Sequence, residues 1–264
     1  MRLIKKAVEI GNGAAVYVPK EYLGKEIVIT LQESVQEIKK RVLTSLIEFM
    51  PNILGVYLYG SYARNEQTLD SDIDILVITK EKDEKIKNSL KDIDLRVVSI
   101  ESIKKSLKNY PLLITPIIKE SVIFLNPSLL EELRATEIDI KKLKWNFDDI
   151  KRIIKIIEKF VEIDDKNIAP SHIYSLIMRI RVCFLIECIL SNKSYSNQAV
   201  KNLLLRNFNE KEVSKFLSIY REIRDNEETK EKISKEEILN LISFLKKYSK
   251  EVENETEKKI TKRN

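Results

Sequence analysis

Two aspartates separated by one residue, Asp72 and Asp74, open an apolar, β-branched stretch that reads "DIDILVIT". Residues i and i+2 of a β-strand point to the same face, so both carboxylates project together. Like charges held this close repel each other unless a cation lies between them. Mg²⁺ suits such a place because it is bound by one or two carboxylates, with waters and substrate phosphates as its other ligands. The spacing therefore predicts a magnesium site.

A third carboxylate, Asp94, stands at the start of the next apolar stretch, "DLRVVSI". If this strand pairs beside the first, Asp94 faces the same metal. Asp92 has the same side-chain parity and competes for the role, but the apolar run starts directly after Asp94 and favours it. The three carboxylates allow two Mg²⁺ ions, or Mn²⁺ in their place, one activating an attacking hydroxyl and the other holding a triphosphate.

A Gly-Ser pair, Gly60 and Ser61, follows the apolar stretch "VYLY" and begins a turn. Glycine lets the backbone approach a phosphate closely, and the serine hydroxyl and nearby N–H groups can donate to its oxygens. Arg64 and Lys80 are candidate charge partners for the phosphates. The alternative for each of them is a surface salt bridge.

The elements that position these residues change in character along the chain. All five glycines lie in the first sixty residues, which predicts strands and turns there and mostly helices later. Residues 33–50 have a helical apolar face that ends at Pro51, and short strands with helical connections follow it. A small α/β sheet domain therefore ends near residue 130. Helical periodicity from residue 131 onward predicts an antiparallel bundle of four or five helices.

The first residues, "LIKKAVEIGNGAAVYVPKEYLGKEIVITL", read as short strands with turns at "GNG" and at Leu23-Gly24-Lys25. They resemble the small swapped-hairpin domains of the AbrB/MazE type. The match consists of Gly11, Asn12, Gly13, Val16, Val18 and Pro19. The resemblance implies a dimer and, in many members, DNA binding. Pairing with a second copy also makes physical sense, because about thirty residues cannot bury a core alone. The alternative is a β-ribbon that extends the next domain.

The Gly60-Ser61 turn and the twin aspartates together resemble the signature of the nucleotidyltransferase superfamily related to DNA polymerase beta. The segment "GSYAR…SDIDILV" is similar to the minimal nucleotidyltransferases of bacteria and archaea, the MntA-like group. The resemblance covers roughly residues 34–126, and Asn65 stands where many members have glycine. It implies that Mg²⁺ on Asp72 and Asp74 grips an NTP and that Asp94 helps to deprotonate the acceptor hydroxyl.

Residues 140–250 look similar to the HEPN-like bundles that shape the acceptor site in some relatives. The ribonuclease subset of HEPN proteins uses an Arg-x4–6-His motif, which this chain lacks before its one histidine, His172. His172 is expected to pack or cap near the start of a helix. The polar helix end "YREIRD" either faces the cleft or is a solvated helix end. It holds Tyr220, Arg221, Arg224 and Asp225.

The composition restricts the remaining choices. A net charge of +6 favours an anionic partner, although solvated Lys and Glu on helix faces explain it equally well. Cys183 and Cys188 have neither a disulfide nor a metal spacing, which suggests a reducing cytoplasm. The N-terminus has no apolar signal core. The longest apolar stretch carries Arg179, Arg181 and Glu187, so it is expected to be a buried helix and no membrane contact is expected.

The expected fold is α+β: a small mixed-sheet nucleotidyltransferase domain with an N-terminal β-hairpin segment and a C-terminal antiparallel helical bundle. The expected divisions are an AbrB-like segment (1–32), a nucleotidyltransferase domain (33–130), a HEPN-like, acceptor-binding bundle (131–250) and a flexible charged tail (251–264). The expected activity is Mg²⁺-dependent transfer of NMP, with ATP favoured, to a protein, small-molecule or RNA hydroxyl. The alternative is a dimeric AbrB-like DNA-binding regulator with a nucleotide-sensing domain. An inactive remnant is disfavoured because the aspartates are intact.

Overall fold

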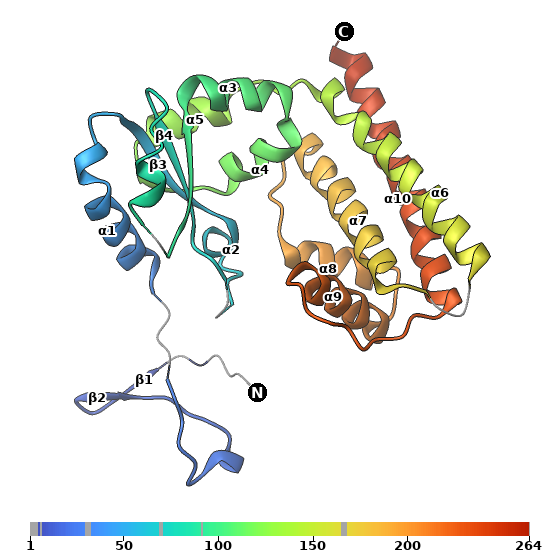
Figure 1. Cartoon of the computed structure of the whole chain (residues 1–264), viewed down its shortest axis with the longest axis horizontal. Coiled ribbons are helices and arrows are strands. Elements are labelled where there is room, and N and C mark those ends of the chain that lie inside the picture. Colours follow the sequence, from blue (N-terminus) through green and yellow to red (C-terminus); the bar gives the residue numbers. More distant parts are fainter. Residues whose placement is uncertain are drawn as a thin grey trace. The chain divides into compact units, whose positions relative to one another are not determined.

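The structure, a computed structural model, describes residues 5, 7–29, 33–68, 71–90, 92–164 and 168–263 (Figure 1). The chain divides into two compact units, Met1–Ser34 and Val35–Asn264. Each unit has its own architecture and is described by itself.

The first unit contains a short antiparallel hairpin of β1 (Val8–Ile10) and β2 (Gly13–Ala15), followed by the 3-10 turn η1 (Lys20–Tyr22). Gly11 has a φ of 55°, the left-handed conformation that the tight "GNG" turn requires. The strand expected from "EIVITL" is absent over residues 26–29, and residues 30–32 lie outside the described part. The described part of this unit offers that segment no partner strand, and a lone strand leaves its backbone groups unpaired.

The second unit contains a four-stranded mixed sheet in the order β5-β4-β3-β6. Strands β4 and β5 are parallel, whereas β3 pairs antiparallel with both β4 and β6. The strands are β3 (Ile53–Tyr59), β4 (Asp74–Thr79), β5 (Asp94–Ser99) and β6 (Val122–Leu125). The α+β class with a mixed sheet and an N-terminal hairpin, expected from the sequence, is confirmed.

Helices cover both faces of this sheet, and the alternation of side chains along β3 and β4 divides the core into two layers. One layer contains Val56, Leu58, Ile75 and Val77 with residues of α1. The other contains Tyr57, Tyr59, Leu76 and Ile78 with residues of α3, α4 and α5. The helices and 3-10 turns of this region are α1 (Val35–Ser45), η2 (Ile47–Phe49), α2 (Gly60–Ala63), η3 (Ile86–Asn88), α3 (Ile100–Asn109), α4 (Pro111–Glu120) and α5 (Pro127–Arg134).

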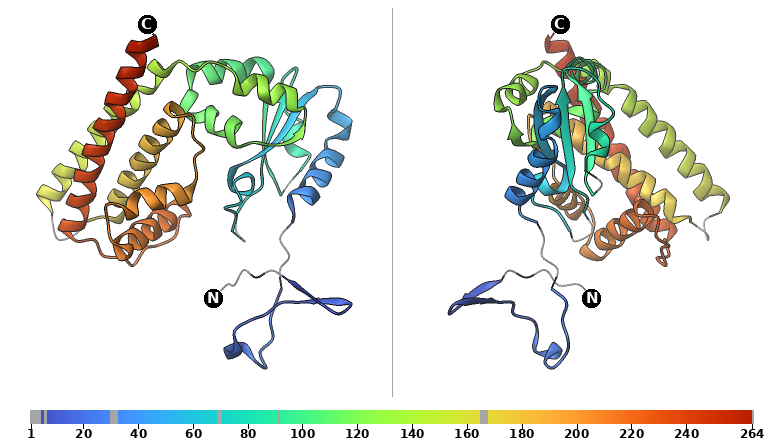
Figure 2. Two further views of the ribbon diagram at one scale, coloured as in Figure 1. Left: turned by 180° about the vertical axis from the view of Figure 1, so that it is seen from behind. Right: turned by 60° about the vertical axis from the view of Figure 1, so that its left-hand side comes forward.

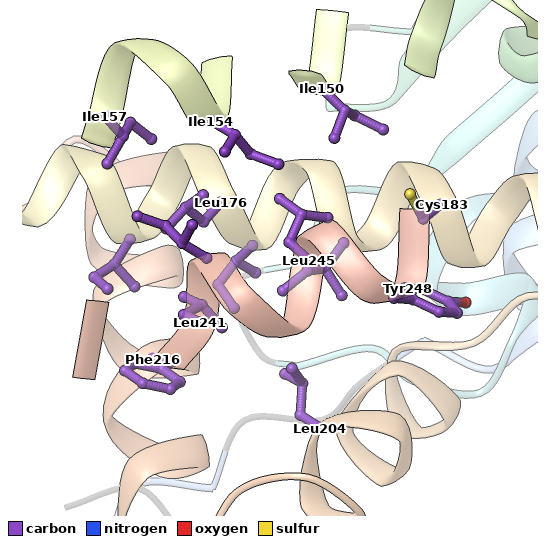
Figure 3. Close-up of a cluster of buried hydrophobic side chains, with 14 of the residues drawn as sticks. Ile150, Ile154, Ile157, Leu176, Cys183, Leu204, Phe216, Leu241, Leu245 and Tyr248 are labelled. Atoms are coloured by element: carbon purple, nitrogen blue, oxygen red, sulfur yellow. The ribbon is translucent and has the colours of Figure 1, made fainter. Parts of the chain in front are cut away.

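A helical bundle follows the turn η4 (Ile140–Leu143). Its helices are α6 (Trp145–Ile163), α7 (Pro170–Leu190), α8 (Asn197–Leu205), α9 (Glu210–Arg224) and α10 (Lys235–Arg263). The apolar helix α7 packs against α6, α9 and α10, and α10 runs beside α6 (Figure 2). Figure 3 shows how side chains from five helices meet around α7 in one buried cluster. Within the described residues, no helix combines the length and the apolarity needed to cross a bilayer.

The end of the chain differs from the expected flexible tail, because α10 continues to Arg263. Val252 and Thr256 are buried, and Ile260 packs against the core of the bundle. These positions follow each other at intervals of four residues, which keeps them on one helix face despite the charges around them. Asn264 lies outside the described residues.

Candidate active site

Asp72 and Asp74 lie at the end of the sheet where β3 finishes and β4 and β5 begin. The register pairs Asp74 with Tyr59 on one side and with Asp94 on the other. Directly paired residues of neighbouring strands point to the same face of a sheet. Tyr59, Asp74 and Asp94 therefore form one row across three strands, which we call the acidic row.

The other three aspartates named from the sequence, Asp72, Asp92 and Asp94, lie in different positions relative to Asp74. Asp72 precedes Asp74 by two residues and is exposed, as is Asp94. Asp94 is the first residue of β5 and donates its backbone N–H to the carbonyl of Ile73. Asp92 lies before the strand, in a turn. The charges of Asp72 and Asp94 both raise the pKa of Asp74, which places these two carboxylates near it, whereas Asp92 is not among the groups that do so.

The electrostatics of Asp74 reflect this crowding. Burial raises the pKa of the Asp74 carboxyl to about 6, and the charges of Asp94, Asp72 and Glu120 add to the rise. Arg64 opposes it but does not cancel it. A carboxylate in this position is costly to ionise unless a cation compensates for its charge.

The Gly-Ser turn packs directly on Asp74. Gly60 has a φ of 76°, and a Cβ atom placed on it would lie 2.8 Å from Cγ of Asp74 and closer still to Oδ2. Ser61 follows it in the single turn of helix α2. Only glycine therefore fits between the end of β3 and the acidic row.

Arg64 lies at the end of α2, close to the acidic row, but its guanidinium is engaged by two carboxylates. Its Nη1 donates to Oε2 of Glu120 over 2.6 Å, and its Nε donates to Oε2 of Glu66 over 3.0 Å. The other oxygen of Glu120 accepts the Gly60 N–H over 2.8 Å. The sequence reasoning missed Glu120, which ends a helix that contains Pro116.

The prediction that Lys80 contacts phosphates disagrees with the geometry. Lys80 follows the last residue of β4, whereas Asp74 is its first. A strand rises 3.3 Å per residue, so the two Cα atoms are about 20 Å apart. The backbone N–H of Lys80 donates to the carbonyl of Asn52, which precedes β3 and so lies at the opposite end of the strands from Asp74.

Arg96 is a cation near the row that the sequence reasoning also missed. It follows Asp94 by two residues on β5 and therefore points to the same face. Its guanidinium carbon lies 5.9 Å from the ring centroid of Tyr59. The parity rule that relates Asp72 to Asp74 would have found it.

The donor set fits a hard divalent cation. All three aspartates offer carboxylate oxygens, the ligands that Mg²⁺ and Mn²⁺ prefer. Among the described residues, no group of three or more His, Cys, Asp or Glu side chains forms a ready-made metal cage. Mg²⁺ does not need one, because it usually takes one or two protein carboxylates and completes its shell with substrate phosphates.

The match to known families agrees with this geometry. The nucleotidyltransferase domain family matches residues 35–183, which is more than half of the chain. The chain belongs to this family. It is a nucleotidyltransferase, and the activity expected from the Gly-Ser turn and the twin aspartates is confirmed at this level.

Relatives of this nucleotidyltransferase include two proteins named as adenylyltransferases, one of them as a putative one. It is 32% identical over 108 residues to the "Putative protein adenylyltransferase" of Methanocaldococcus jannaschii, covering 41% of this chain and 96% of that protein. It is 30% identical over 96 residues to the spectinomycin 9-adenylyltransferase of Campylobacter jejuni, covering 36% of each. The alignment therefore spans about a third of the Campylobacter enzyme.

Two further similarities concern a solved structure and the N-terminal unit. Spectinomycin adenyltransferase AAD(9) from Enterococcus faecialis, solved with ATP and spectinomycin, is 16% identical with a TM-score of 0.46. The alignment covers 81% of this chain and 98% of that one. Residues 2–33 match a family described as "Putative transposon-encoded protein". The AbrB-like and HEPN-like resemblances stay predictions.

We expect Asp74→Asn to stabilise the metal-free nucleotidyltransferase. The pKa of Asp74 is about 6 in the folded state against an ordinary value of 3.8, so folding favours its protonated form. Stability therefore falls as the pH rises from 4 to 6, and above pH 6 the ionised carboxylate keeps a cost that the neutral amide lacks. The shift corresponds to about 3 kcal/mol, which we reduce to about 1–2 kcal/mol because Asp74 is only partly buried.

Thermal unfolding in EDTA at pH 8 and at pH 4 measures this effect. The variant should have the higher melting temperature at pH 8, and the two proteins should nearly coincide at pH 4. A gain of equal size at both pH values would show that charge is not its cause.

Proposed function

We propose that this nucleotidyltransferase transfers AMP from ATP to a hydroxyl group of an acceptor and releases pyrophosphate. The observation that carries the proposal is the acidic row, with Asp94 in register with Asp74 and the Gly60 turn packed on the same carboxylate. ATP is favoured because both curated relatives named above are adenylyltransferases.

In this mechanism the acceptor hydroxyl attacks the α-phosphorus of ATP. A new oxygen–phosphorus bond forms, the bond to the bridging oxygen breaks, and pyrophosphate leaves with that electron pair. Asp94 accepts the hydroxyl proton, since it is exposed at the end of the row. Members of this family generally use divalent metal ions. Asp72 and Asp74, with Asp94 in register beside them, would hold Mg²⁺, which would supply positive charge to the triphosphate.

The Gly-Ser turn binds the phosphates in this proposal. The Ser61 hydroxyl donates to a phosphate oxygen, and the missing side chain of Gly60 lets the triphosphate approach the row. The Gly60 N–H is assigned no phosphate contact because it donates to Glu120. Arg64 is likewise committed to Glu66 and Glu120, so its effect on the phosphates is indirect. Arg96 takes the place of Lys80 as the candidate cation.

The choice of Asp94 over Asp92 leads to a matched prediction. Asp94→Asn should lower the rate of AMP transfer by about a hundredfold or more, because general-base assistance is worth about 10²–10⁴. Asp92→Asn, two residues away and outside the row, should leave the rate within about twofold of wild type. Steady-state rates with saturating ATP and Mg²⁺ compare the two, and the reverse order of effects would transfer the assignment to Asp92.

The bundle is proposed as the acceptor-binding region, in keeping with its HEPN-like pattern. Asn197 and Gln198, at the start of α8, donate to the carboxylate of Glu66 just after the turn. The guanidinium of Arg181 lies 5.6 Å from the ring centroid of Tyr195 and 4.9 Å from that of Tyr220. Tyr220 is buried in the bundle core and Tyr195 is partly buried against it, so Arg181 is held by both rings beside the segment that contacts Glu66. The end of α9, in contrast, pairs Arg224 with Asp225.

The deciding experiment incubates the protein with ATP labelled on the α-phosphate, Mg²⁺ and a cell lysate. Label should appear in one acceptor, and Asp74→Asn should remove it. Labelled protein, labelled RNA or a labelled small molecule, for which spectinomycin is a direct probe, would separate the three acceptor classes. Absence of ATP binding and of labelling with every NTP would overturn the proposal.

A second candidate function is that of a dimeric DNA-binding regulator. It is based on the N-terminal unit, whose proposed boundary is residue 32. No described residue of Met1–Ser34 is buried. Several large apolar side chains are exposed there, among them Val8, Ile10, Ile27, Val28 and Ile29. Such a surface is unfavourable in water and suits pairing with a second copy. The match to a transposon-encoded family makes DNA a reasonable partner for this unit.

We expect Ile27→Asp with Ile29→Asp to convert a dimer into a monomer, because the two charges would be buried in the pairing surface. Light scattering on the full chain measures the mass, and a gel shift with DNA measures retention. AMP transfer should continue in the variant if the first proposal holds. If the wild-type protein is a monomer and does not bind DNA, the second candidate function is excluded.

A further inference from the structure

Glu120 joins two parts of the site that no sequence pattern connects. It is the last residue of α4, and its carboxylate accepts the Gly60 N–H on one oxygen and the Arg64 guanidinium on the other. We propose that Glu120 and Arg64 are positioning residues that hold the Gly60–Ser61 turn against Asp74, and that Glu66 extends this link to the helical bundle. The inference rests on the proposed function of the acidic row.

The Arg64–Glu120 pair is shielded from solvent. The side chains are 18% and 11% exposed, whereas those of the surface pair Lys104–Glu132 are 49% and 59% exposed. Charge-assisted hydrogen bonds are stronger than neutral ones, and screening by water is weak in such a place. Removing one partner would leave a partly buried charge without compensation. The pair is therefore a firm attachment between α4 and the turn.

The position of the Gly60–Ser61 turn in turn determines the position of the Asp74 side chain. Gly60 touches the Asp74 carboxylate so closely that a methyl group could not fit between them. Any displacement of the turn would let the Asp74 side chain move or force it to do so. Because catalysis depends on placing reacting groups within fractions of an ångström, such a movement lowers the rate without removing any catalytic group.

Glu66 connects Arg64 to the helical bundle. It accepts from Arg64 Nε, and it also accepts the Asn197 side-chain amide over 2.9 Å and the Gln198 N–H over 3.2 Å. Asn197 in turn accepts from Arg181 of α7 over 2.9 Å. An unbroken series of hydrogen bonds thus runs from the bundle to the Gly60 turn. A bundle that shifts on binding an acceptor would shift the turn with it.

The test compares Glu120→Ala and Glu120→Gln with wild type. The glutamine oxygen can still accept the Gly60 N–H but loses the ion pair, so it should rescue part of the effect. Glu132→Ala is the matched control, because it removes a glutamate–lysine pair of similar length from an exposed place. Three quantities are measured in the full chain: hydrogen exchange of the segment 57–66, the half-saturating Mn²⁺ concentration, and kcat and KM for ATP.

We expect Glu120→Ala to exchange faster over 57–66 and to lower kcat by about ten- to a hundredfold while KM for ATP changes by less than about threefold. Its half-saturating Mn²⁺ concentration should rise about tenfold, and Glu120→Gln should fall between it and wild type. The control should match wild type in all three measurements.

Unchanged exchange and unchanged Mn²⁺ binding in Glu120→Ala would overturn the inference. So would tighter ATP binding in both Glu120 variants, which would mean that Glu120 competes with a phosphate for the Gly60 N–H. If the wild-type protein binds neither Mn²⁺ nor ATP, the proposed function fails. Hydrogen exchange over 57–66 still decides whether Glu120 holds the turn.

Discussion

Asp74→Asn is expected to reduce AMP transfer by about a thousandfold or more, because electrostatic compensation of the triphosphate is the largest contribution that this site can make. The amide has nearly the shape of the carboxylate but carries no negative charge for a divalent cation. Asp74 is also the central residue of the row, between Tyr59 and Asp94. Single-turnover transfer from labelled ATP measures the loss.

The stability of the same variant excludes unfolding as the cause. Asp74→Asn should lose activity and yet melt at a higher temperature than wild type in EDTA, because its raised pKa shows that the ionised carboxylate is unfavourable where it lies. Asp148→Asn provides the control, since Asp148 is exposed on α6. An active Asp74→Asn protein would contradict the assignment of the acidic row, whatever its melting temperature.

The acidic row could be predicted because local rules determine it. The alternation of side chains along a strand predicts that Asp72 and Asp74 share a face. Strand β4 begins only at Asp74, but the charge of Asp72 does act on the Asp74 carboxyl. Asp94 needed one further assumption, that its strand lies beside that of Asp74, and the parallel register confirms this geometry. The same rule could not exclude Lys80 as a phosphate ligand. Parity gives the face of the sheet on which a side chain lies, but not the end of the strand.

The residues that the sequence did not reveal depend on tertiary packing. Glu120 ends a helix that contains Pro116 in its interior, which weakens the local signal for a helix. It reaches Gly60 across 60 positions of the sequence. The prediction of a flexible C-terminal tail was wrong for a related reason. The charged residues around Val252 and Thr256 obscured a narrow apolar helix face in the sequence. Composition describes a segment's average, whereas packing depends on particular positions.

Gly60→Ala should be nearly as harmful to catalysis as loss of an aspartate, although it adds only one methyl group. A residue with φ of 76° is strained by about 1–2 kcal/mol when it carries a side chain. The new Cβ would also lie 2.8 Å from Cγ of Asp74, so the carboxylate must leave its place in the row. We expect kcat for AMP transfer to fall by about a hundredfold, the usual effect of a misplacement of about 1 Å.

Gly55→Ala is the matched comparison because it crowds the same strand away from the row. Its Cβ would lie 2.7 Å from Cζ of Tyr57, a ring that is fully buried and cannot turn aside. That variant should therefore lose more thermal stability than Gly60→Ala but keep its activity per folded molecule within about threefold, because overpacking a core costs about 1–3 kcal/mol without altering distant groups. If both variants lose stability and activity in the same proportion, the contact between Gly60 and Asp74 has no special role, and the turn acts only through folding.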